Sequence, residues 1–377
     1  MKKRIAIIGS GIAGLTAANL LIKNSDFEVM VYEKEKMLTL DEGYGIQLST
    51  NSISILNKIG FNNIGNNDIF NPSKLNFYSI DNKICDLDLS KFNNNSAKYT
   101  TLQRSTLIEF LKDKLFTNNF RFGKEIKKIS KLKDKLLINF KDNTNDLVDF
   151  IIVSDGVFSN TKSIIENKII KPKYNGSVAI RTVVKFSEEF NYDSKNISLI
   201  MLPKAHIVIY PINKKNDFNV VCIVREKLSQ TYDINSIISK KILSIDKNFK
   251  NLFNGDLKLW PVYITKKPMQ SIYSNVFYLG DAFYTFSPAL AQGASQSIES
   301  AYELFNLILE NKKNIKNLYF KKRLKKTNIV NNRSKLNYFS FHLSNSLIVK
   351  IRNFIIKKIS KSDKYLNYYL RNIYQKN

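Results

Sequence analysis

The sequence predicts an α/β fold in which a parallel-sheet domain is interrupted by an inserted antiparallel sheet and followed by a helical tail. Three observations predict it. A β-α-β pattern opens the chain, alternating apolar and polar residues dominate residues 177–263, and helical periodicity returns after residue 293. The first domain is therefore discontinuous, because its closing strand and helix follow the inserted sheet.

Short apolar runs predict strands, and a period near 3.6 predicts helices. In chain order, the expected elements are strand 4–8, helix 12–23, strand 27–33, helix 105–115, a meander over 120–153 that ends in strand 150–153, strands 178–186, 197–202, 206–212, 218–224 and 276–279, and helix 293–309. The expected domains are a first domain at 1–75, 100–172 and 274–317, a sheet domain at 76–99 and 173–273, and a basic helical C-terminal region at 318–377.

The formal net charge of +27 is concentrated in the tail, where residues 318–377 carry fifteen Lys or Arg and one acid, Asp363. Only nine basic residues of the chain are Arg, and neither a zinc-finger spacing nor an aromatic RNA-binding signature is present, so nucleic acid is not favoured as a partner. Residues 347–359 form an amphipathic helical pattern. It fits either contact with an anionic membrane or packing on the protein, and we favour packing.

The cysteines, Cys85 and Cys222, are too few and too far apart for a disulfide framework or a metal site, which predicts a reducing cytoplasm. The basic and apolar N-terminus imitates a signal peptide, but polar residues break it and its glycines have another explanation. We therefore expect a cytoplasmic protein, peripheral at the inner face of the membrane if the tail binds lipid. A homodimer is compatible with the sequence.

A glycine motif follows the first expected strand and opens the first expected helix. Residues 9–14 read Gly-Ser-Gly-Ile-Ala-Gly, and Glu33 ends the second strand. The first glycine permits a tight turn, the second lets the backbone approach a pyrophosphate, and the third lets helix and strand pack closely. The helix N-terminus favours phosphate, and Glu33 can accept hydroxyls of an adenosine ribose. The pattern predicts a Rossmann-like dinucleotide site with these residues: Gly9, Gly11, Ile12, Ala13, Gly14 and Glu33.

A second motif follows strand 276–279 and precedes a helix led by Gly293. It reads Gly-Asp-Ala at 280–282 and ends Gln-Gly-Ala-Ser-Gln at 292–296. This stretch resembles the ribityl-binding motif of the flavoprotein hydroxylases typified by p-hydroxybenzoate, salicylate and 3-hydroxybenzoate hydroxylases. The resemblance implies bound FAD, with Asp281 accepting a ribityl hydroxyl and the backbone N–H groups of Gln292 and Gly293 stabilising the charge on reduced flavin. The same expected site includes Gly280, Pro288 and Ala294.

Three further segments resemble the same family. Asp155 and Gly156, after strand 150–153, resemble the Asp-Gly turn that serves the FAD pyrophosphate and the nicotinamide donor. The family usually ends this motif with Arg, whereas this chain has Lys162 nearby, so donor binding is expected to differ. Arg104, at a helix start, resembles the arginine that reaches the phosphate or ribityl side of the flavin. Residues 43–47 resemble the small-residue turn beside the isoalloxazine ring.

One strand carries the candidate substrate groups. His206, Val208 and Tyr210 alternate along residues 205–211 and are expected to point to one face. Enzymes of the 3-hydroxybenzoate type have a similar His-x-x-x-Tyr-Pro strand in which the histidine deprotonates the phenol, so the resemblance implies that role for His206, with Tyr210 beside it. A structural role for His206 is the alternative. Tyr284 stands where the family commonly has a histidine, which puts any mechanism through that histidine in doubt.

The resemblance covers about residues 1–310 and implies an FAD-dependent monooxygenase. NADH or NADPH reduces the FAD, dioxygen gives the C4a-hydroperoxide, and an oxygen atom passes to a small aromatic, phenolic substrate. Two alternatives stay open. One is a flavoprotein reductase or epoxidase that acts on an isoprenoid or quinone precursor, and the other is a non-catalytic FAD-binding protein.

Overall fold

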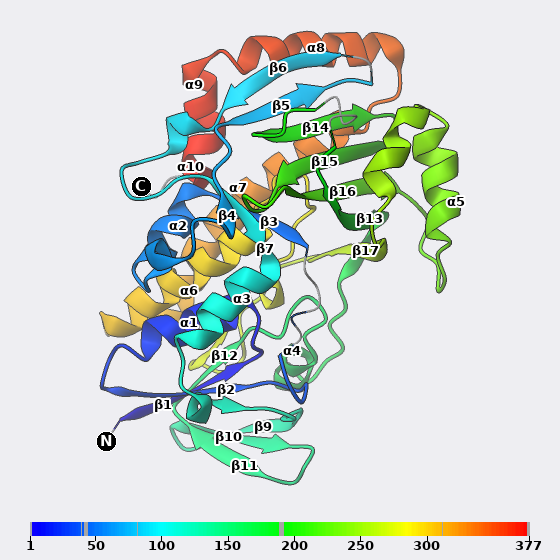
Figure 1. Ribbon diagram of the computed structural model, residues 1–377. Helices are drawn as coiled ribbons and strands as arrows, with labels where there is room; N and C mark the ends of the chain where they lie inside the picture. Colours follow the sequence, from blue (N-terminus) through cyan, green and yellow to red (C-terminus); the bar gives the residue numbers. More distant parts are fainter. Residues whose placement is uncertain are drawn as a thin grey trace.

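The computed structural model describes residues 2–38, 40, 44–80, 82–187, 192–310 and 312–374, and it confirms the predicted fold class. Figure 1 shows a parallel sheet with its helices near the N-terminus, a larger sheet beyond it, and C-terminal helices across the far end of the molecule. Among the described residues, no helix has the length and apolar character needed to cross a membrane.

The first domain is built on a five-stranded sheet in which every pairing is parallel, in the order β18-β12-β1-β2-β8. Its strands are β1 (Lys3–Ile8), β2 (Phe27–Tyr32), β8 (Phe120–Arg121), β12 (Phe150–Val153) and β18 (Val276–Tyr278). The inner strands are almost fully apolar because both faces of the sheet are covered. The late strand β18 joins this sheet, so the domain is discontinuous in sequence.

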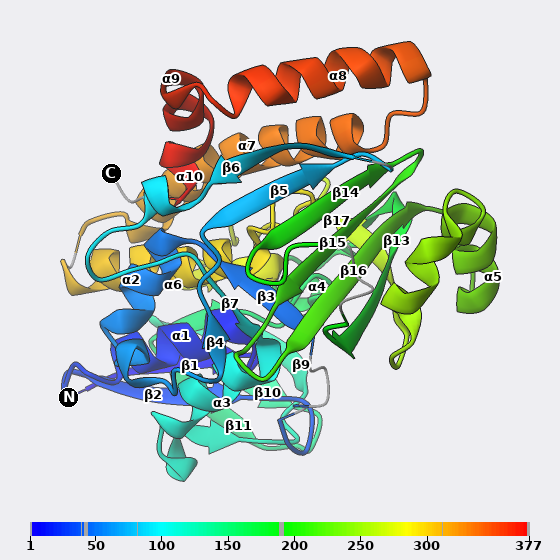
Figure 2. The ribbon, with the colours of Figure 1, turned by 45° about the horizontal axis from the view of Figure 1, so that its top comes forward.

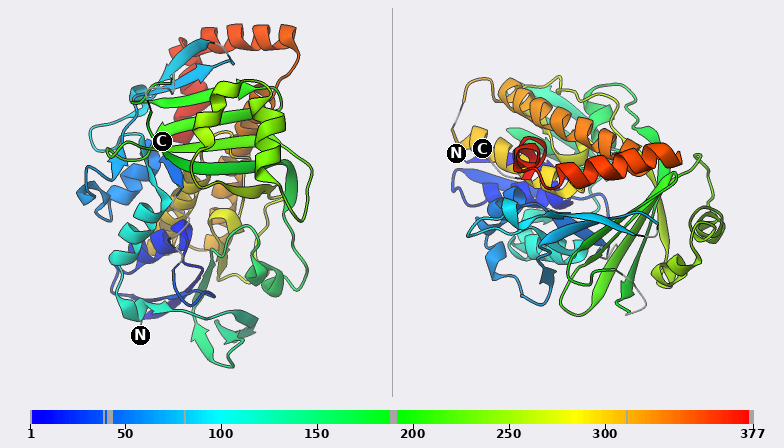
Figure 3. Two further views of the ribbon diagram at one scale, coloured as in Figure 1. Left: turned by 45° about the vertical axis from the view of Figure 1, so that its right-hand side comes forward. Right: turned by 90° about the horizontal axis from the view of Figure 1, so that it is seen from above.

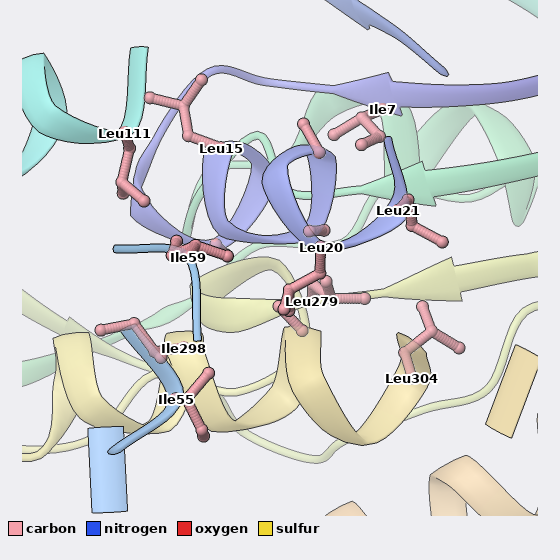
Figure 4. Packing of buried hydrophobic residues seen from close by; sticks show 14 of the residues in the cluster. Ile7, Leu15, Leu20, Leu21, Ile55, Ile59, Leu111, Leu279, Ile298 and Leu304 are labelled. Atoms are coloured by element: carbon pink, nitrogen blue, oxygen red, sulfur yellow. The ribbon is translucent and has the colours of Figure 1, made fainter. Parts of the chain in front are cut away.

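Helices cover one face of the parallel sheet and a small sheet covers the other. The helices are α1 (Ile12–Leu21), α2 (Thr50–Asn57), α3 (Arg104–Asp113) and α6 (Gly293–Leu309). Figure 4 shows apolar side chains such as Leu20 and Leu279 between α1 and α6, which belong to one buried cluster. The opposite face packs against an antiparallel sheet of β9 (Ile126–Leu132), β10 (Lys135–Phe140) and β11 (Asn145–Val148).

The second sheet has seven strands in the order β17-β13-β16-β15-β14-β5-β6. They are β5 (Lys74–Tyr78), β6 (Lys83–Asp88), β13 (Lys173–Lys185), β14 (Ile197–Leu202), β15 (Ala205–Pro211), β16 (Asp217–Arg225) and β17 (Lys258–Ile264). The sequence predicted a wholly antiparallel sheet. The observed sheet is mixed, because β5 pairs in parallel with β14. These two strands are far apart in the chain, so no hairpin fixes their relative direction.

Short elements connect the two sheets. A three-stranded sheet of β3 (Gly45–Leu48), β7 (Thr100–Gln103) and β4 (Ile69–Phe70) lies between them. The remaining short helices and turns are α4 (Asn160–Ile165), α5 (Ile234–Ile238), η1 (Phe61–Asn63), η2 (Ser90–Phe92), η3 (Thr117–Asn119), η4 (Ser239–Leu243), η5 (Lys247–Phe253) and η6 (Gly280–Ala282).

The C-terminal region packs on one face of the seven-stranded sheet. It comprises α7 (Ile315–Phe341), α8 (Ser346–Ile359), α9 (Asp363–Leu366), η7 (Asn367–Arg371) and α10 (Asn372–Tyr374). Figure 2 shows the strands fanning out beneath α7 and α8, and Figure 3 shows α5 on the opposite face. The tail therefore covers one face of the seven-stranded sheet and is not simply attached to the end of the first domain.

Candidate active site

The three sequence motifs meet at the carboxyl edge of the parallel sheet. A methyl group added to Gly9 would lie 2.8 Å from the carbonyl oxygen of Ser154 and 2.9 Å from the backbone of Asp155. A methyl group added to Gly280 would lie 2.8 Å from Cβ of Ala13. The glycine loop therefore touches both other motifs, as a single nucleotide site at a sheet edge requires.

Each glycine of the first motif has a distinct environment. Gly9 has a φ of +98°, which favours glycine, and a methyl group on Gly14 would lie 2.1 Å from the Gly9 carbonyl oxygen. Gly11 has an extended backbone conformation, with φ −77° and ψ −177°, and no atom of the described residues lies within 4 Å of the position that its Cβ would occupy. The space beside Gly11 and the N-terminus of α1, which has no acid in its first turn, suits a phosphate.

Glu33 lies just after β2 and borders the glycine loop. Its carboxylate accepts hydrogen bonds from the backbone N–H of Ser10 at 3.0 Å and from the Ser10 hydroxyl at 2.6 Å. The side chain is half-buried, and its other oxygen accepts the backbone N–H of Glu35 at 3.1 Å. These contacts hold the carboxylate beside the loop, where it can accept ribose hydroxyls.

The Asp-Gly motif supplies an acceptor without a protein partner. Oδ2 of Asp155 accepts the backbone N–H of Thr161 at 3.3 Å, whereas its buried Oδ1 has no hydrogen-bond partner among the described residues. Burial raises the pKa of Asp155. Gly156 has a φ of +85° and open space beside it. Lys162, which lies near the place of the family's usual Arg, is buried, and its ammonium donates to the carbonyl oxygen of Ala282 at 2.8 Å and so joins this motif to the Gly-Asp motif.

Asp281 and Arg104 come together from distant parts of the chain. Asp281 lies in η6 and Arg104 begins α3, whose first backbone N–H donates to the carbonyl oxygen of Tyr44. Asp281 is accessible to solvent, yet the surrounding protein desolvates its carboxylate and raises its pKa to about 6, an effect that the positive charge of Arg104 opposes. A carboxylate enclosed by protein and open on one side suits a ligand hydroxyl. Gly43 of the expected flavin-side turn lies outside the described residues.

The loop 288–292 leads into α6. Gln292 is the N-cap of α6 and is buried, donating its amide to the hydroxyl of Ser49 at 3.3 Å. Gly293 has open space beside it, Ala294 packs on the first core, and α6 has no acid in its first turn. Tyr284, in place of the family's histidine, is buried with its ring 5.0 Å from that of Phe286.

These residues fit FAD. Within the described part of the chain, two helix N-termini lack acids, three glycines have open space beside them and one buried carboxylate oxygen has no partner. These features match the phosphates, ribityl chain and ring of that cofactor. The residues that would hold it are Gly9, Gly11, Ile12, Ala13, Gly14, Glu33, Arg104, Asp155, Gly156, Gly280, Asp281, Pro288, Gly293 and Ala294.

A cavity of about 400 Å³ begins at Pro288–Ala291 and extends between the seven-stranded sheet and the helices α7 and α8. Its walls are mostly apolar, with side chains such as Phe77 and Leu199 from the sheet. Arg352 is the one ordinarily charged side chain among the described lining residues, and its guanidinium donates to the Ser340 carbonyl and the Asn353 side chain. A cavity of this size and character suits one aromatic substrate.

His206 lines this cavity and is paired with the other histidine of the chain. Its Nδ1 lies 2.7 Å from Nε2 of His342, at the end of α7, and the two side chains are 1% and 2% exposed. Burial lowers the pKa of both imidazoles, so both are neutral at pH 7. Because one nitrogen of His206 is used in this pair, the ring nitrogen left for a substrate is Nε2.

His206, Val208 and Tyr210 do share one face of β15, since their neighbours Ile207 and Ile209 pack in the core on the other side. Tyr210 is buried but is not among the residues that line the cavity. Burial raises its pKa, an effect that neighbouring Gln47 opposes, and Gln47 lines the cavity and accepts a hydrogen bond from the Tyr99 hydroxyl at 2.8 Å. Tyr210 therefore lies behind the cavity wall, beside Gln47.

The FAD binding domain family matches residues 2–314, which is most of the chain. The chain belongs to this family of flavin-dependent hydroxylases. It is an FAD-dependent monooxygenase, for which NAD(P)H is the usual electron donor, and this family membership sets aside the non-catalytic alternative.

Curated relatives span most of the chain. This monooxygenase is 24% identical over 338 residues to the 6-hydroxynicotinate 3-monooxygenase of Pseudomonas fluorescens, which covers 81% of this chain and 83% of the relative. It is 21% identical to the salicylate hydroxylase of Pseudomonas putida, over 84% of this chain and 78% of the relative.

Solved structures share the fold over nearly the whole chain. HpxO of Klebsiella pneumoniae, crystallised with FAD and uric acid, superposes with a TM-score of 0.87 at 16% identity, covering 98% of this chain and 96% of that chain. The agreement extends through the C-terminal helices, so the tail belongs to the shared fold.

The sequence analysis predicted the helical tail but did not identify His342, or the tail helices, as part of the cavity region. His342 lies in a basic helical segment and is 136 residues from its partner. One feature of the sequence could have indicated the contact. The chain has two histidines, and a second histidine is a candidate hydrogen-bond partner for the first.

Proposed function

We propose that this monooxygenase hydroxylates a phenolic ring held in the cavity beside His206. The observation that carries the proposal is a mostly apolar cavity that begins at the FAD-side loop Pro288–Ala291 and has a neutral imidazole in its wall. When bound, FAD reduced by NADH or NADPH supplies the activated oxygen atom from O2. The relatives with aromatic substrates in their names support a ring as the acceptor.

His206 is proposed to accept the phenol proton at Nε2. A phenolate is more electron-rich than a phenol and attacks an electrophilic oxygen more readily, so proton removal activates the ring. Because burial lowers the pKa of His206, the proton is expected to move only as the ring attacks. The proposal assigns His206 the Nδ1–H tautomer, in which Nδ1–H donates to His342 Nε2 and Nε2 is free to accept the phenol proton. His342 thus acts as a positioning residue.

Tyr210 and Gln292 have supporting roles in this proposal. Tyr210 lies behind Gln47 at the cavity wall and is proposed to orient the substrate through it. Gln292, at the start of α6, presents its backbone N–H with that of Gly293 toward the expected flavin ring, where negative charge develops on reduction.

His206→Ala tests the assignment. The variant is expected to keep its FAD content and its reduction by NAD(P)H, while hydroxylated product falls by roughly 10²–10⁴-fold and peroxide is released instead. The loss should shrink at high pH, where the phenol ionises without help. Tyr210→Phe should have a smaller effect.

Val208→Ala is the matched control for His206→Ala, because it enlarges the same wall without removing a proton acceptor. It should weaken substrate binding with no change in pH dependence. Full coupling in His206→Ala, or loss of its flavin, would show that His206 is a structural residue of the sheet.

The surface of α8 also bears on where the protein works and how it assembles. We propose that the protein works in the cytoplasm at the inner face of the membrane, supported by the basic and apolar surface of α8 described below. The same surface charge gives no support to a homodimer through α8.

A further inference from the structure

An apolar stripe on α8 faces solvent. Five side chains of α8 and one of α7 form it, each at least 48% exposed: Phe339, Leu347, Ile348, Ile351, Phe354 and Ile355. We call this set the α8 patch. The helix is the outermost element at its end of the molecule (Figures 1 and 3). Packing on the protein uses a different side of α8, where Arg352 and Ile356 are buried.

Exposed lysines flank the α8 patch. Lys350, Lys357 and Lys361 follow one another at intervals of seven and four residues, so they form a stripe along one edge of the apolar face, and Lys358 lies within that face. Neither α7 nor α8 contains an acidic residue. The surface therefore combines a contiguous apolar area with positive charge.

The cavity of the proposed active site opens in this patch. Phe339, Ile348, Ile351 and Ile355 line the cavity and are also exposed to solvent, so they form its mouth. The mouth carries no acid, and the cavity behind it is mostly apolar. An apolar ligand that enters here passes directly from the α8 patch to the wall that contains His206.

The charge and the apolar surface of the α8 patch together indicate which kind of partner it binds. A second copy of this chain would place like-charged lysines against one another, and a nucleic acid would leave the apolar side chains in water. A bilayer that contains anionic lipid satisfies both features, since apolar side chains enter the headgroup region and lysines face the lipid phosphates.

We propose that α8 docks on an anionic lipid bilayer and that the substrate is a phenol with an apolar substituent that enters the cavity from the membrane. The substrate part of this inference rests on the proposed function, whereas the docking part does not. Membrane docking brings the cavity mouth to the phase in which such a phenol dissolves.

Vesicle co-sedimentation tests the docking. The protein with FAD should bind vesicles of phosphatidylcholine with phosphatidylglycerol, bind pure phosphatidylcholine weakly, and dissociate as salt rises. Each lysine near an anionic surface contributes roughly fivefold in affinity, so the triple variant Lys350→Gln, Lys357→Gln, Lys358→Gln should bind about a hundredfold more weakly. Leu347→Ser with Phe354→Ser, at positions outside the cavity, should weaken binding by roughly tenfold or more.

Matched controls lie at the other end of the molecule. Lys127→Gln with Lys128→Gln changes two exposed lysines of β9 and should leave vesicle binding within about twofold of the unchanged protein. Equal loss in this control would show that net charge, and not the α8 patch, drives binding. Absence of binding, binding that ignores salt, or a dimer that Leu347→Ser with Phe354→Ser dissociates would each overturn the docking proposal.

The substrate route has a separate readout. Vesicles should raise turnover of a long-chain alkylphenol, and the lysine variant should lose that gain while oxidising a small water-soluble phenol at the unchanged rate. Turnover of the alkylphenol that vesicles do not alter would overturn the membrane route. A protein that binds vesicles but hydroxylates neither phenol would instead overturn the proposed function and leave the docking intact.

Discussion

Acidification is expected to remove stability that the buried pair of His206 and His342 contributes at neutral pH. These are the two histidines of the chain, and burial holds the pKa of both far below the ordinary value near 6.5. The folded protein keeps both rings neutral, whereas the unfolded chain protonates them as pH falls below about 6.5. The unfolded state then binds more protons, so stability falls as the pH drops from about 6.5 toward 3.

The magnitude follows from the linkage relation. Between about pH 7.5 and pH 5, a histidine that is neutral when folded and has a pKa near 6.5 when unfolded loses roughly 2 kcal/mol of stability, so the pair loses roughly 4 kcal/mol. Asp281 acts in the opposite direction, because its raised pKa lets the folded state bind a proton in the same range.

Urea unfolding of the FAD-saturated protein at the two pH values measures this loss. His206→Gln with His342→Gln removes every histidine while keeping amide groups that can hydrogen-bond, so the difference between the unchanged protein and this variant isolates the pair. The variant should be less sensitive to acid by about 3–4 kcal/mol. Parallel pH profiles, with a difference below about 1 kcal/mol, would show that the two rings are solvated and that the pair does not exist as described.

Two further predictions concern the cofactor site. Gly11→Ala should leave the unfolding free energy of the protein without FAD within about 0.5 kcal/mol, because its Cβ meets no atom of the described part of the chain within 4 Å. The same change should abolish flavin retention by filling the phosphate space. Gly14→Ala should instead destabilise both forms, since its Cβ would lie 2.1 Å from the Gly9 carbonyl oxygen; equal stability of the two variants in urea would contradict this assignment. Asp281→Ala should weaken FAD retention by about 1.5–3 kcal/mol in fluorescence titrations, and release of FMN from the unchanged protein would contradict the site altogether.

Sequence reasoning worked best where local chemistry dictates the backbone. Strands Phe150–Val153 and Ile197–Leu202 and helix Gly293–Leu309 begin and end where they were predicted, because apolar runs and glycine or polar breaks define their limits. The three cofactor motifs were recognisable because each combines a backbone requirement with a chemical group. Their meeting at one sheet edge then follows from the topology of parallel strands.

Contacts between distant segments could not be read in the same way. Nothing in residues 315–341 signals that His342 meets β15, because that contact depends on how α7 crosses the larger sheet. The exposure of Leu347 and Phe354 could not be predicted from the sequence either. A helix that packs on protein and a helix that faces a membrane have the same amphipathic period. The parallel pairing of β5 with β14 was also not predictable, because it joins strands that are distant in the sequence.

The most direct test of the central claim is incorporation of oxygen from ¹⁸O₂ during NAD(P)H-dependent turnover. The FAD-loaded protein should be offered phenols with substituents of increasing apolar length, and each product analysed by mass spectrometry. The account predicts one ¹⁸O atom in a hydroxylated ring for at least one phenol, with a large loss of that product in His206→Ala. A protein that oxidises NAD(P)H and reduces its substrate without incorporating ¹⁸O into any product would contradict the account.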